Sequence, residues 1–416
     1  MTQAPMPLEI EYSNFSNNNS IQNEAAIAAE HIINSIETKQ PYYKIFDTEH
    51  AREQAKLCAP HAKAINDNYS DLIVIAMGGA MLNPATIIAL CCDTKSSTKI
   101  HFLYNTDPLC FQKLIAKLTL KNCAILAISN SGETLETIAL VGAMIAEFEK
   151  ANIADLGKRF YFITNPLKGK LYQIAQKINA TILPHTDKIS GRYSGLTNVT
   201  SFVAQVALVD IEQYLTGANV VINDFLQQKE NSQSALSAAN IFGFKELMMV
   251  NIGYLQQFDV YLEWYSQIIA ESLGKEEQGI TPIRGLGPND QHSMLQLYLD
   301  GPRDKLYSLF YIKELSQELP EYNTCLLKEL DYIAGKSLTH IHTANFKATK
   351  YALINRNSPV RSVILKDLSA HTIGALVTHS MLEIIMLGQM MQINPFNQPG
   401  VELIKTKSKQ IVQNAD

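Results

Sequence analysis

The sequence predicts an α/β protein built from two α/β/α sandwich domains, each with a mainly parallel sheet. The chain has 416 residues, which is more than one hydrophobic core usually holds. Short apolar runs alternate with segments of helical periodicity along most of the chain. The apolar runs are nearly continuous, which is typical of parallel strands whose two faces are both covered by helices.

The first series of alternating elements lies between residues 71 and 184. Strand-like runs fall at residues 71–77, 99–105, 122–129, 159–165 and 181–184. Helical segments fall between them, at residues 84–92, 111–118, 134–150 and 167–178. A strand that is followed by a helix and a further strand predicts a parallel pair joined by a crossover helix.

An apolar segment over residues 196–215 leads to a second series. Its strands are expected at residues 246–251, 279–284, 305–312 and 361–365. Its helices are expected at residues 255–273, after Asp290, and at 371–393. We therefore expect four parts, namely an N-terminal extension (1–45), a first α/β domain (46–200), a second α/β domain (201–395) and a polar C-terminal segment (396–416).

The composition excludes several classes of protein. A formal net charge of -5 argues against a nucleic-acid-binding surface, which is usually basic. The chain starts without the basic and apolar stretches of a signal peptide. Residues 371–393 are apolar but include His371, His379 and Glu383, so a buried helix is expected rather than a membrane span. We expect a cytoplasmic protein.

The cysteines show no metal-ligand spacing and no CxxC pair. They are expected to be free thiols in a reducing compartment. The six are Cys58, Cys91, Cys92, Cys110, Cys123 and Cys325.

Two turns of the first series follow a strand and open a helix. The turn at residues 78–84 begins with Gly78 and Gly79, and paired glycines let the backbone approach a ligand closely. A tight turn without a ligand is the alternative. The turn at 129–137 reads SNSGETLET. Its three hydroxyl residues beside a helix N-terminus suit a phosphate. A simple N-cap by Ser131 is the alternative, and Glu133 would repel a phosphate unless its side chain faces solvent.

Two further segments carry charged side chains. Arg192, in SGRYS, is either a solvated surface residue or an arginine held at a domain junction, where it could stabilise an oxyanion. Gln267 and Glu271 are four residues apart on one face of a largely apolar helix. A carboxylate there needs a partner or has a raised pKa. A structural glutamate is the alternative.

The last two segments hold a histidine and a lysine. Residues 285–293 form a glycine-rich loop, with Asp290 expected as the N-cap of a helix and His292 in its first turn. The helix dipole there would favour a neutral imidazole. Prolines and a glycine fix a turn over residues 394–400, and Lys405 follows it. Either residue could instead be structural or part of the surface.

Taken together and in order, these segments resemble the signature segments of the phosphoglucose isomerase family. The most specific pieces are ESLGK at 271–275, DQHS at 290–293 and NQPGVEL at 397–403. The SNSGETLET turn is also similar to the phosphosugar-binding loop of the wider SIS (sugar isomerase) superfamily. The resemblance covers residues 78 to 405 and implies two SIS-type domains.

The resemblance implies an aldose–ketose isomerase that interconverts glucose-6-phosphate and fructose-6-phosphate through a cis-enediol. Glu271 would be the base, Arg192 would stabilise the enediolate, and His292 and Lys405 would serve ring opening. The substrate would be bound by Gly79, Ala80, Ser129, Asn130, Ser131, Thr134, Gln267 and Gln398. No cofactor or metal is expected. A homodimer is expected, with His292 entering the site of the partner.

The chain departs from the family pattern at three positions. The family usually has serine where Ala80 stands, and many members have lysine where Asn130 stands. The leucine-glycine step common in the family is Leu82-Asn83 here. We expect weaker phosphate binding and retained activity. An isomerase of another phosphosugar, such as mannose-6-phosphate, and a non-catalytic phosphosugar-binding protein are the alternatives.

Overall fold

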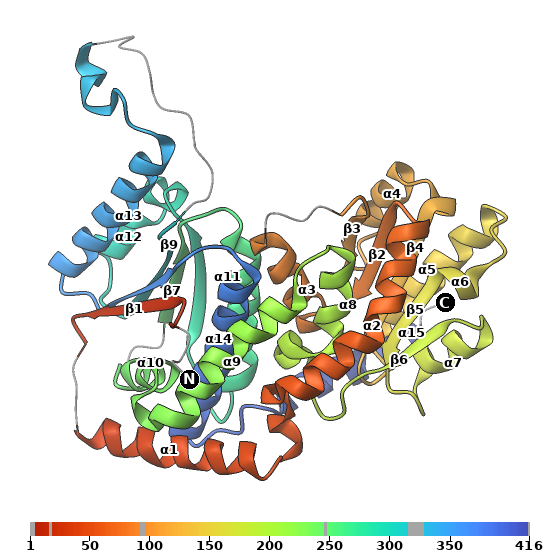
Figure 1. The fold of residues 1–416 in the computed structure, drawn as a ribbon, viewed down its shortest axis with the longest axis horizontal. Helices are drawn as coiled ribbons and strands as arrows, with labels where there is room; N and C mark the ends of the chain where they lie inside the picture. The colour runs from red at the N-terminus through yellow and green to blue at the C-terminus, as the bar shows by residue number, and fades with distance from the viewer. Residues whose placement is uncertain (1–4, 16–18, 92–95, 245–247, 315–327, 415–416) are drawn as a thin grey trace. The chain divides into compact units, whose positions relative to one another are not determined.

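The protein consists of two compact units, each built around one sheet (Figure 1). The computed structural model describes residues 5–15, 19–91, 96–244, 248–314 and 328–414. The first unit, called the 32–216 unit, contains Ile32–Thr216 and Phe396–Asp416. The second, called the 217–395 unit, contains Met1–His31 and Gly217–Pro395.

The sheet of the 32–216 unit has five parallel strands in the order β3-β2-β4-β5-β6. All five strands predicted for the first series are confirmed. Their bounds are β2 (Asp71–Ala76), β3 (Lys99–Leu103), β4 (Cys123–Ser129), β5 (Phe160–Thr164) and β6 (Thr181–Pro184).

Helices cover both faces of this sheet. Every residue of β4 is buried, which requires cover on both sides because successive side chains point to opposite faces. One face packs against α4 (Pro108–Lys117), α5 (Leu135–Lys150) and α7 (Lys170–Lys177). On the other face, the Tyr161 ring contacts His61 of α2 (Thr48–Asn68) and Phe202 of α8 (Asn198–Val206).

The bridging segment over residues 196–215 is not one continuous helix. A 3-10 turn, η3 (Gly191–Leu196), precedes α8, and a second helix, α9 (Ile211–Gln228), begins after a break. Leu208 in the break has a positive φ of 60°, a left-handed conformation that an α-helix cannot include. The segment reads as continuously apolar because nearly all of α8 is buried.

The 217–395 unit has a mixed sheet in the order β1-β10-β9-β7-β8. The four strands β7 (Met248–Gly253), β8 (Thr281–Leu286), β9 (Lys305–Ile312) and β10 (Val360–Leu365) are parallel, as predicted. The expected start of β7 at Glu246 lies outside the described residues. A fifth strand, β1 (Leu8–Ser13), pairs antiparallel with β10 at the edge of the sheet.

The two faces of this sheet are covered by different helices. Tyr298 of α12 (Leu295–Asp300) and Phe346 of α13 (Leu338–Asn355) pack on one face, over β7 and β9. On the other face lie α10 (Gln233–Phe242), α11 (Phe258–Leu273) and α14 (Ala370–Met390). Among the described residues, α14 alone is long and apolar enough to cross a membrane, but 94% of its apolar window is buried inside the protein, as expected for a core helix.

The compact units follow the chain differently from the expected four parts. The chain passes between units after residues 31, 216 and 395, whereas the sequence suggested divisions at 45, 200 and 395. The expected N-terminal extension contains β1 and the helix α1 (Asn19–Glu37), and the C-terminal segment contains α15 (Glu402–Gln413). The other helices are α3 (Gly79–Leu90) and α6 (Leu156–Arg159).

Candidate active site

The strand order of the 32–216 unit has a switch point between β2 and β4. The connection from β2 runs outward to β3, and the next strand, β4, then pairs with the opposite side of β2 (Figure 1). The loops after β2 and β4 therefore diverge, and such a switch point is where open α/β sheets bind ligands. Both predicted turns, at 78–84 and 129–137, lie at the carboxyl edge of this sheet.

The turn after β4 has a fixed backbone. Gly132 adopts a positive φ of 66°, and a Cβ at that position would lie 3.1 Å from Thr164 Oγ1. Its N–H donates to the carbonyl oxygen of Ser129 at 3.2 Å. The Ser129 hydroxyl lies 2.9 Å from the Thr134 hydroxyl. Glycine is thus required at the bend, and two predicted hydroxyl residues meet across it.

The same turn leaves the start of α5 open to an anion. Thr134 occupies the N-cap position, but its side chain accepts no hydrogen bond from α5 in the described structure. Ser131, the alternative cap, instead accepts from the N–H of Glu133 at 3.1 Å. The first N–H groups of α5 and two hydroxyls therefore face the turn without a side-chain cap, which suits a phosphate.

Glu133 and Asn130 point away from that helix start. The exposed Glu133 carboxylate accepts from the backbone N–H of Lys170, at the beginning of α7, at 3.1 Å. The Asn130 carboxamide donates to the carbonyl oxygen of Ile189 at 2.8 Å. The expected repulsion between Glu133 and a phosphate is relieved by this geometry, because the carboxylate is tied to a neighbouring helix.

Arg192 is buried, with 1% of its surface exposed, so the alternative of a solvated surface arginine is wrong. Its Nη1 donates to Gln398 Oε1 at 2.9 Å, and its Nη2 donates to the carbonyl oxygen of Asn397 at 3.1 Å. Its guanidinium lies 5.2 Å from the centre of the Tyr193 ring. The structure thus brings together Arg192 and Gln398, two residues that are 206 positions apart in the sequence.

Aromatic packing fixes the segment that carries Gln398. The Phe396 ring stacks on Tyr42 with a centroid distance of 5.0 Å and an interplanar angle of 12°. It also contacts Tyr43 at 5.2 Å and Tyr193 at 5.5 Å. Sequence reasoning missed Phe396, Asn397 and Tyr193, although NPFNQPG and SGRYS contain all three. The available signal was an aromatic residue next to polar residues in each of these two short segments.

The glycine turn after β2 touches the backbone of Arg192 directly. A Cβ on Gly79 would lie 2.3 Å from Arg192 N and 2.4 Å from its Cα. Any other residue at this position would push the two segments apart. Ala80 follows in the first turn of α3 and is buried. Gly79 is therefore needed to let the turn approach the arginine.

Lys405 lies in the same unit as Arg192, in the first turns of α15. Its side chain is exposed. The C-terminal segment, expected to be a polar tail, is therefore helical at Lys405.

In the 217–395 unit, Gln267 and Glu271 lie on one face of α11, as predicted. Gln267 Nε2 donates to Glu271 Oε1 at 2.8 Å, and both side chains are half-buried. Ile268, Ile269 and Leu273 anchor the opposite face of the helix in the core. The carboxylate thus receives a neutral hydrogen-bond donor on a helix that cannot easily move.

His292 stands in a different local structure from the one predicted. It is exposed and ends a 3-10 turn, η5 (Asn289–His292). Asp290 caps no helix, because its carboxylate accepts from the N–H of Leu286 at 3.0 Å. The expected helix start therefore does not exist at this position, and the helix-dipole argument for a neutral imidazole fails.

Glu271 and His292 lie at opposite edges of the sheet of this unit. Helix α11 follows the carboxyl end of β7 and leads back to the start of β8, with Glu271 near its end. His292 follows the carboxyl end of β8. A helix of this length spans about 24 Å. The chain order therefore places Glu271 and His292 toward opposite ends of the strands of this unit.

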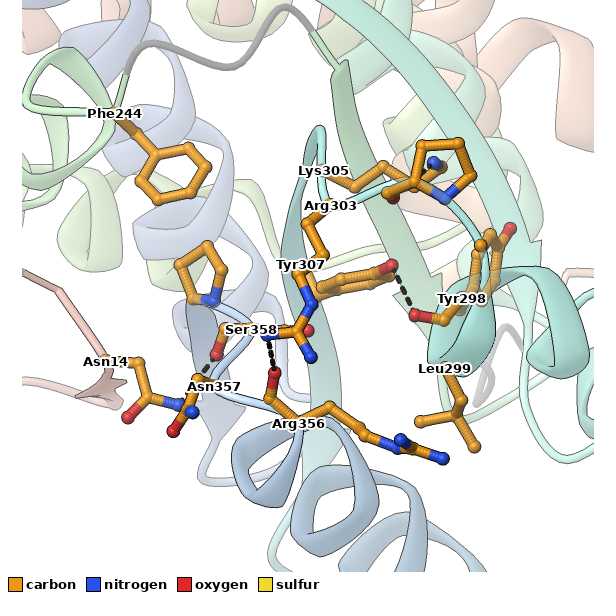
Figure 2. Close-up of a pocket in the computed structure, with 13 residues that line it drawn as sticks. Asn14, Phe244, Tyr298, Leu299, Arg303, Lys305, Tyr307, Arg356, Asn357 and Ser358 are labelled. Atoms are coloured by element: carbon orange, nitrogen blue, oxygen red, sulfur yellow. Dashed lines mark hydrogen bonds between the residues drawn. The ribbon is translucent and has the colours of Figure 1, made fainter.

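A cavity of about 240 Å³ lies elsewhere in the 217–395 unit, at the amino ends of β9 and β10 (Figure 2). Its lining includes Arg303, Lys305 and Arg356. Arg303 donates to the carbonyl oxygen of Arg356 at 2.8 Å, Lys305 pairs with Asp304, and Arg356 lies 2.7 Å from Asp300. None of the predicted site residues lines this cavity, and its cations are already engaged.

The described residues contain no group of three His, Cys, Asp or Glu side chains that could hold a metal ion. Cys58, Cys91, Cys110 and Cys123 are free thiols. Cys92 and Cys325 lie outside the residues that the structure describes. Burial raises the pKa of the Cys58 and Cys123 thiols to about 12, so neither is a reactive thiolate.

Sequence comparison connects this geometry with one family. The family described as phosphoglucose isomerase matches residues 60–416. A glucose-6-phosphate isomerase of Campylobacter jejuni is 30% identical over 383 residues, which cover 90% of this chain and 92% of the relative. One of Methanocaldococcus jannaschii is 30% identical over 353 residues, covering 82% of this chain and 83% of the relative.

Solved structures support the same fold. A hypothetical protein of Thermus thermophilus superposes with a TM-score of 0.88 and 24% identity, covering 97% of this chain and all of its own. A glucose-6-phosphate isomerase of Chlamydia trachomatis gives a TM-score of 0.83 at 19% identity, covering 99% of this chain and 89% of its own. A tagatose-6-phosphate ketose/aldose isomerase of Escherichia coli gives 0.55 at 14%, covering 90% and 95%.

Proposed function

Because this chain belongs to the phosphoglucose isomerase family, we propose how its residues divide the work of interconverting glucose-6-phosphate and fructose-6-phosphate. The chain is an aldose–ketose isomerase. The reaction removes a proton from one carbon and returns it to the neighbouring carbon, with an enediolate between the two steps. It needs a base, a fixed cation for the oxyanion, and a binding site for the phosphate.

Glu271 is the base that moves the proton between C1 and C2. Its support is the half-buried position on α11 with the Gln267 amide 2.8 Å from one oxygen. An amide donor fixes the orientation of the carboxylate oxygen that it binds. A carboxylate held in this way can both take and return a proton.

Arg192 stabilises the enediolate, and Gln398 orients the Arg192 guanidinium. This assignment rests on the observation that carries the proposal most strongly, the burial of Arg192 with its guanidinium held by Gln398 and Asn397. A cation that is already fixed needs little reorganisation when the negative charge develops. The contact between Gly79 and the Arg192 backbone places this cation beside the loop after β2.

The turn after β4 binds the phosphate through backbone N–H groups of α5 and the hydroxyls of Ser129, Ser131 and Thr134. Its support is the uncapped start of α5 and the hydroxyl pair that faces it. Gly79, Ala80 and Asn130 lie around the same edge of the sheet. Phosphate contacts far from the reacting carbons supply binding energy that positions the sugar.

His292 and Lys405 serve ring opening, and we propose that His292 acts in the site of a partner subunit. Its support is the separation of Glu271 and His292 by the full length of α11 within one chain. A symmetric dimer would supply each site with Glu271 from one copy and His292 from the other. We also propose that this homodimer is cytoplasmic.

A coupled assay tests the substrate. Fructose-6-phosphate is offered to the protein and glucose-6-phosphate formation is followed, with mannose-6-phosphate measured in parallel. We expect turnover of fructose-6-phosphate. Preference for mannose-6-phosphate would favour an isomerase of another phosphosugar, and binding without turnover would favour a phosphosugar-binding protein. The names of the relatives favour neither alternative.

Mixing two inactive variants tests the shared site. Glu271→Gln and His292→Ala homodimers are unfolded together and refolded, and random assortment makes about half of the dimers mixed. In a mixed dimer one site collects both changes and the other collects none, so activity should return to about a quarter of the wild-type value. Mixed dimers that show no recovered activity would place both residues in one subunit.

A further inference from the structure

The segment that carries Arg192 has little regular structure of its own. It comprises residues 189–192, which follow β6 and include Gly191 and Arg192, the first two residues of the 3-10 turn η3. Ile189 and Arg192 are buried and the two residues between them are partly buried, and carbonyl oxygens removed from water need hydrogen-bond donors from the protein. Where those donors come from decides how rigidly the arginine is held.

One donor is the Asn83 carboxamide on α3. Asn83 is 2% exposed, and its Nδ2 donates to the carbonyl oxygens of Gly79 at 2.7 Å and Gly191 at 2.9 Å. Turning the amide over would place Oδ1 against two carbonyl oxygens, so the acceptors fix its orientation. Asn83 therefore joins the loop after β2 to the residue directly before Arg192.

A second donor is Asn130, from the loop after β4. Its Nδ2 donates to the carbonyl oxygen of Ile189 at 2.8 Å. The two carboxamides therefore bind carbonyl oxygens two residues apart in the same segment. Asn83 lies on α3, which follows β2, and Asn130 follows β4, so the two amides come from the two connections that flank the switch point of the sheet.

Besides the two amide hydrogen bonds, the close approach of Gly79 to the backbone of Arg192 also restrains the segment. The position of a Gly79 Cβ is 2.3 Å from Arg192 N, and that of a Gly191 Cβ is 3.1 Å from Ala80 N. The segment is thus packed against the start of α3 and receives hydrogen bonds from α3 and from the loop after β4. Its guanidinium end is held separately, by Gln398 and Asn397.

We propose that Asn83 and Asn130 are positioning residues for Arg192. They fix the 189–192 segment so that the guanidinium lies where the enediolate oxygen forms. This inference rests on the proposed role of Arg192. It also gives a function to two of the three positions at which the chain departs from the family pattern, because both asparagines serve the arginine segment.

Losing either amide would let the segment shift while the phosphate turn stays in place. A misplacement of about 1 Å in a catalytic group can cost about a hundredfold in rate. We expect Asn83→Ala to lower kcat about tenfold and Asn130→Ala about threefold, because each leaves the other amide in place. KM for fructose-6-phosphate should change less than about twofold, since the proposed phosphate contacts, the N–H groups of α5 and the hydroxyls of Ser129, Ser131 and Thr134, are kept.

The decisive measurement repeats both changes in an Arg192→Met background. If the asparagines act through Arg192, each further change should lower the remaining kcat by less than about twofold. Equal losses in both backgrounds would show a general structural role and overturn the inference. An Arg192→Met enzyme with normal turnover would remove the proposed role of Arg192, and the inference with it.

Asn198→Ala is the matched control. Asn198 is a buried asparagine in the same unit, and its Nδ2 donates to the carbonyl oxygen of Pro184 at 2.8 Å. The Asn198→Ala variant loses a comparable amide-to-carbonyl hydrogen bond outside the 189–192 segment. Its kcat should therefore stay within about twofold of wild type. A kcat loss as large as that of Asn83→Ala would contradict the specific role of the segment.

Asn130→Lys keeps the inference testable if Asn83→Ala does not fold. Asn130 is only half-buried, and a lysine there adds a cation near the phosphate turn. We expect tighter inhibition by inorganic phosphate together with a severalfold lower kcat, because the bond to Ile189 is lost. Tighter phosphate binding with unchanged kcat would assign Asn130 to the phosphate site and overturn its part in holding the segment.

Discussion

Glu271 of α11 and Glu383 of the neighbouring α14 differ in burial and in the partners of their carboxylates. Glu383 of α14 is 1% exposed and pairs with Arg361 of β10, while Tyr265 of α11 donates to its other oxygen. His379 lies 3.4 Å from it. Glu271, six residues after Tyr265 on α11, is half-buried and accepts from the neutral Gln267 amide.

The difference separates a structural carboxylate, Glu383, from the proposed base, Glu271. Burial alone would raise the pKa of Glu383, but the charge of Arg361, with smaller contributions from the nearby His379 and Ser237 side chains, outweighs burial and lowers the pKa to about 2. A carboxylate of that basicity is a poor proton acceptor near neutral pH. The more deeply buried carboxylate is therefore the structural one, and the half-buried Glu271 is the proposed base.

The two buried arginines repeat the contrast. Arg361 donates to Ser308, Ser237 and Tyr265 as well as to Glu383, and all of these lie on regular elements of the core. Arg192 lies in a short segment and its guanidinium binds the loop residues Asn397 and Gln398. The guanidinium of Arg361 is therefore bound by residues of strands and helices, whereas that of Arg192 is bound by residues of a loop.

Glu271→Gln should give the largest effect on the reaction. The glutamine keeps the shape of the side chain and removes its basicity, so kcat should fall by about two to four orders of magnitude. Sugar-phosphate binding and the unfolding midpoint should stay close to wild type, because no core charge is broken. Steady-state kinetics with fructose-6-phosphate and denaturant unfolding measure the two quantities.

Glu263→Gln is the control for that variant. Glu263 lies on the same helix, and its carboxylate is 3.1 Å from Arg284 near the surface. Its removal should leave kcat within about twofold of wild type, since exposed ion pairs contribute little. Near-normal turnover in Glu271→Gln would remove Glu271 from the mechanism.

Glu383→Gln should lower the stability of the protein and leave kcat nearly unchanged. Removing the carboxylate leaves the Arg361 charge buried without its ionic partner, which costs about 3–5 kcal/mol of unfolding free energy. The kcat of the folded variant should stay within about threefold of wild type, because Glu383 does not touch the substrate in the proposed site. Guanidinium unfolding combined with kinetics tests both parts. A large loss of kcat at unchanged stability would make Glu383 part of the active site.

The sequence predicts much of this architecture and little of its internal bonding. Alternating strands and helices give all five strands of the 32–216 unit, and the spacing of four residues correctly places Gln267 beside Glu271. The strand β1 was missed, although Leu8, Ile10 and Tyr12 alternate with two glutamates in a pattern typical of an edge strand.

Bonds between distant segments leave no periodic signal. Asn83 and Gly191 are 108 residues apart, and neither composition nor helical spacing connects them. Arg361 lies in a mostly apolar strand and Glu383 in a mostly apolar helix. Nothing in the sequence indicates that the two side chains form an ion pair. The prediction that Asp290 caps a helix was wrong for a related reason. The Asp290 carboxylate accepts a hydrogen bond from the backbone N–H of Leu286, which precedes it in the chain.

The stability of the protein at low pH should depend on Glu383. Its pKa is lowered from 4.5 to about 2 on folding, so the unfolded chain takes up the proton first as the pH falls. The contribution is complete above about pH 5 and is lost progressively down to about pH 2, at no more than about 1.4 kcal/mol per pH unit. Between pH 5.5 and 3.5 the wild type should therefore lose about 1 kcal/mol more than Glu383→Gln. Parallel slopes for the two proteins would show that the carboxylate titrates alike in both states.

Thr134→Ala should give the smallest effect, and it tests binding rather than chemistry or stability. The hydroxyl of Thr134 lies 2.9 Å from that of Ser129 at the open start of α5, where the phosphate is proposed to bind. Its loss removes one neutral donor from an anion that keeps the backbone N–H groups, so KM should rise about three- to tenfold. The value of kcat should change less than about twofold, because the phosphate contact is nearly the same in the ground and transition states. Thr216→Ala, which removes a hydroxyl bonded to Glu212 within α9, should change neither constant. A fall in kcat at constant KM would instead tie Thr134 to the reacting end of the sugar, and the division between the binding turn and the reacting groups would have to be redrawn.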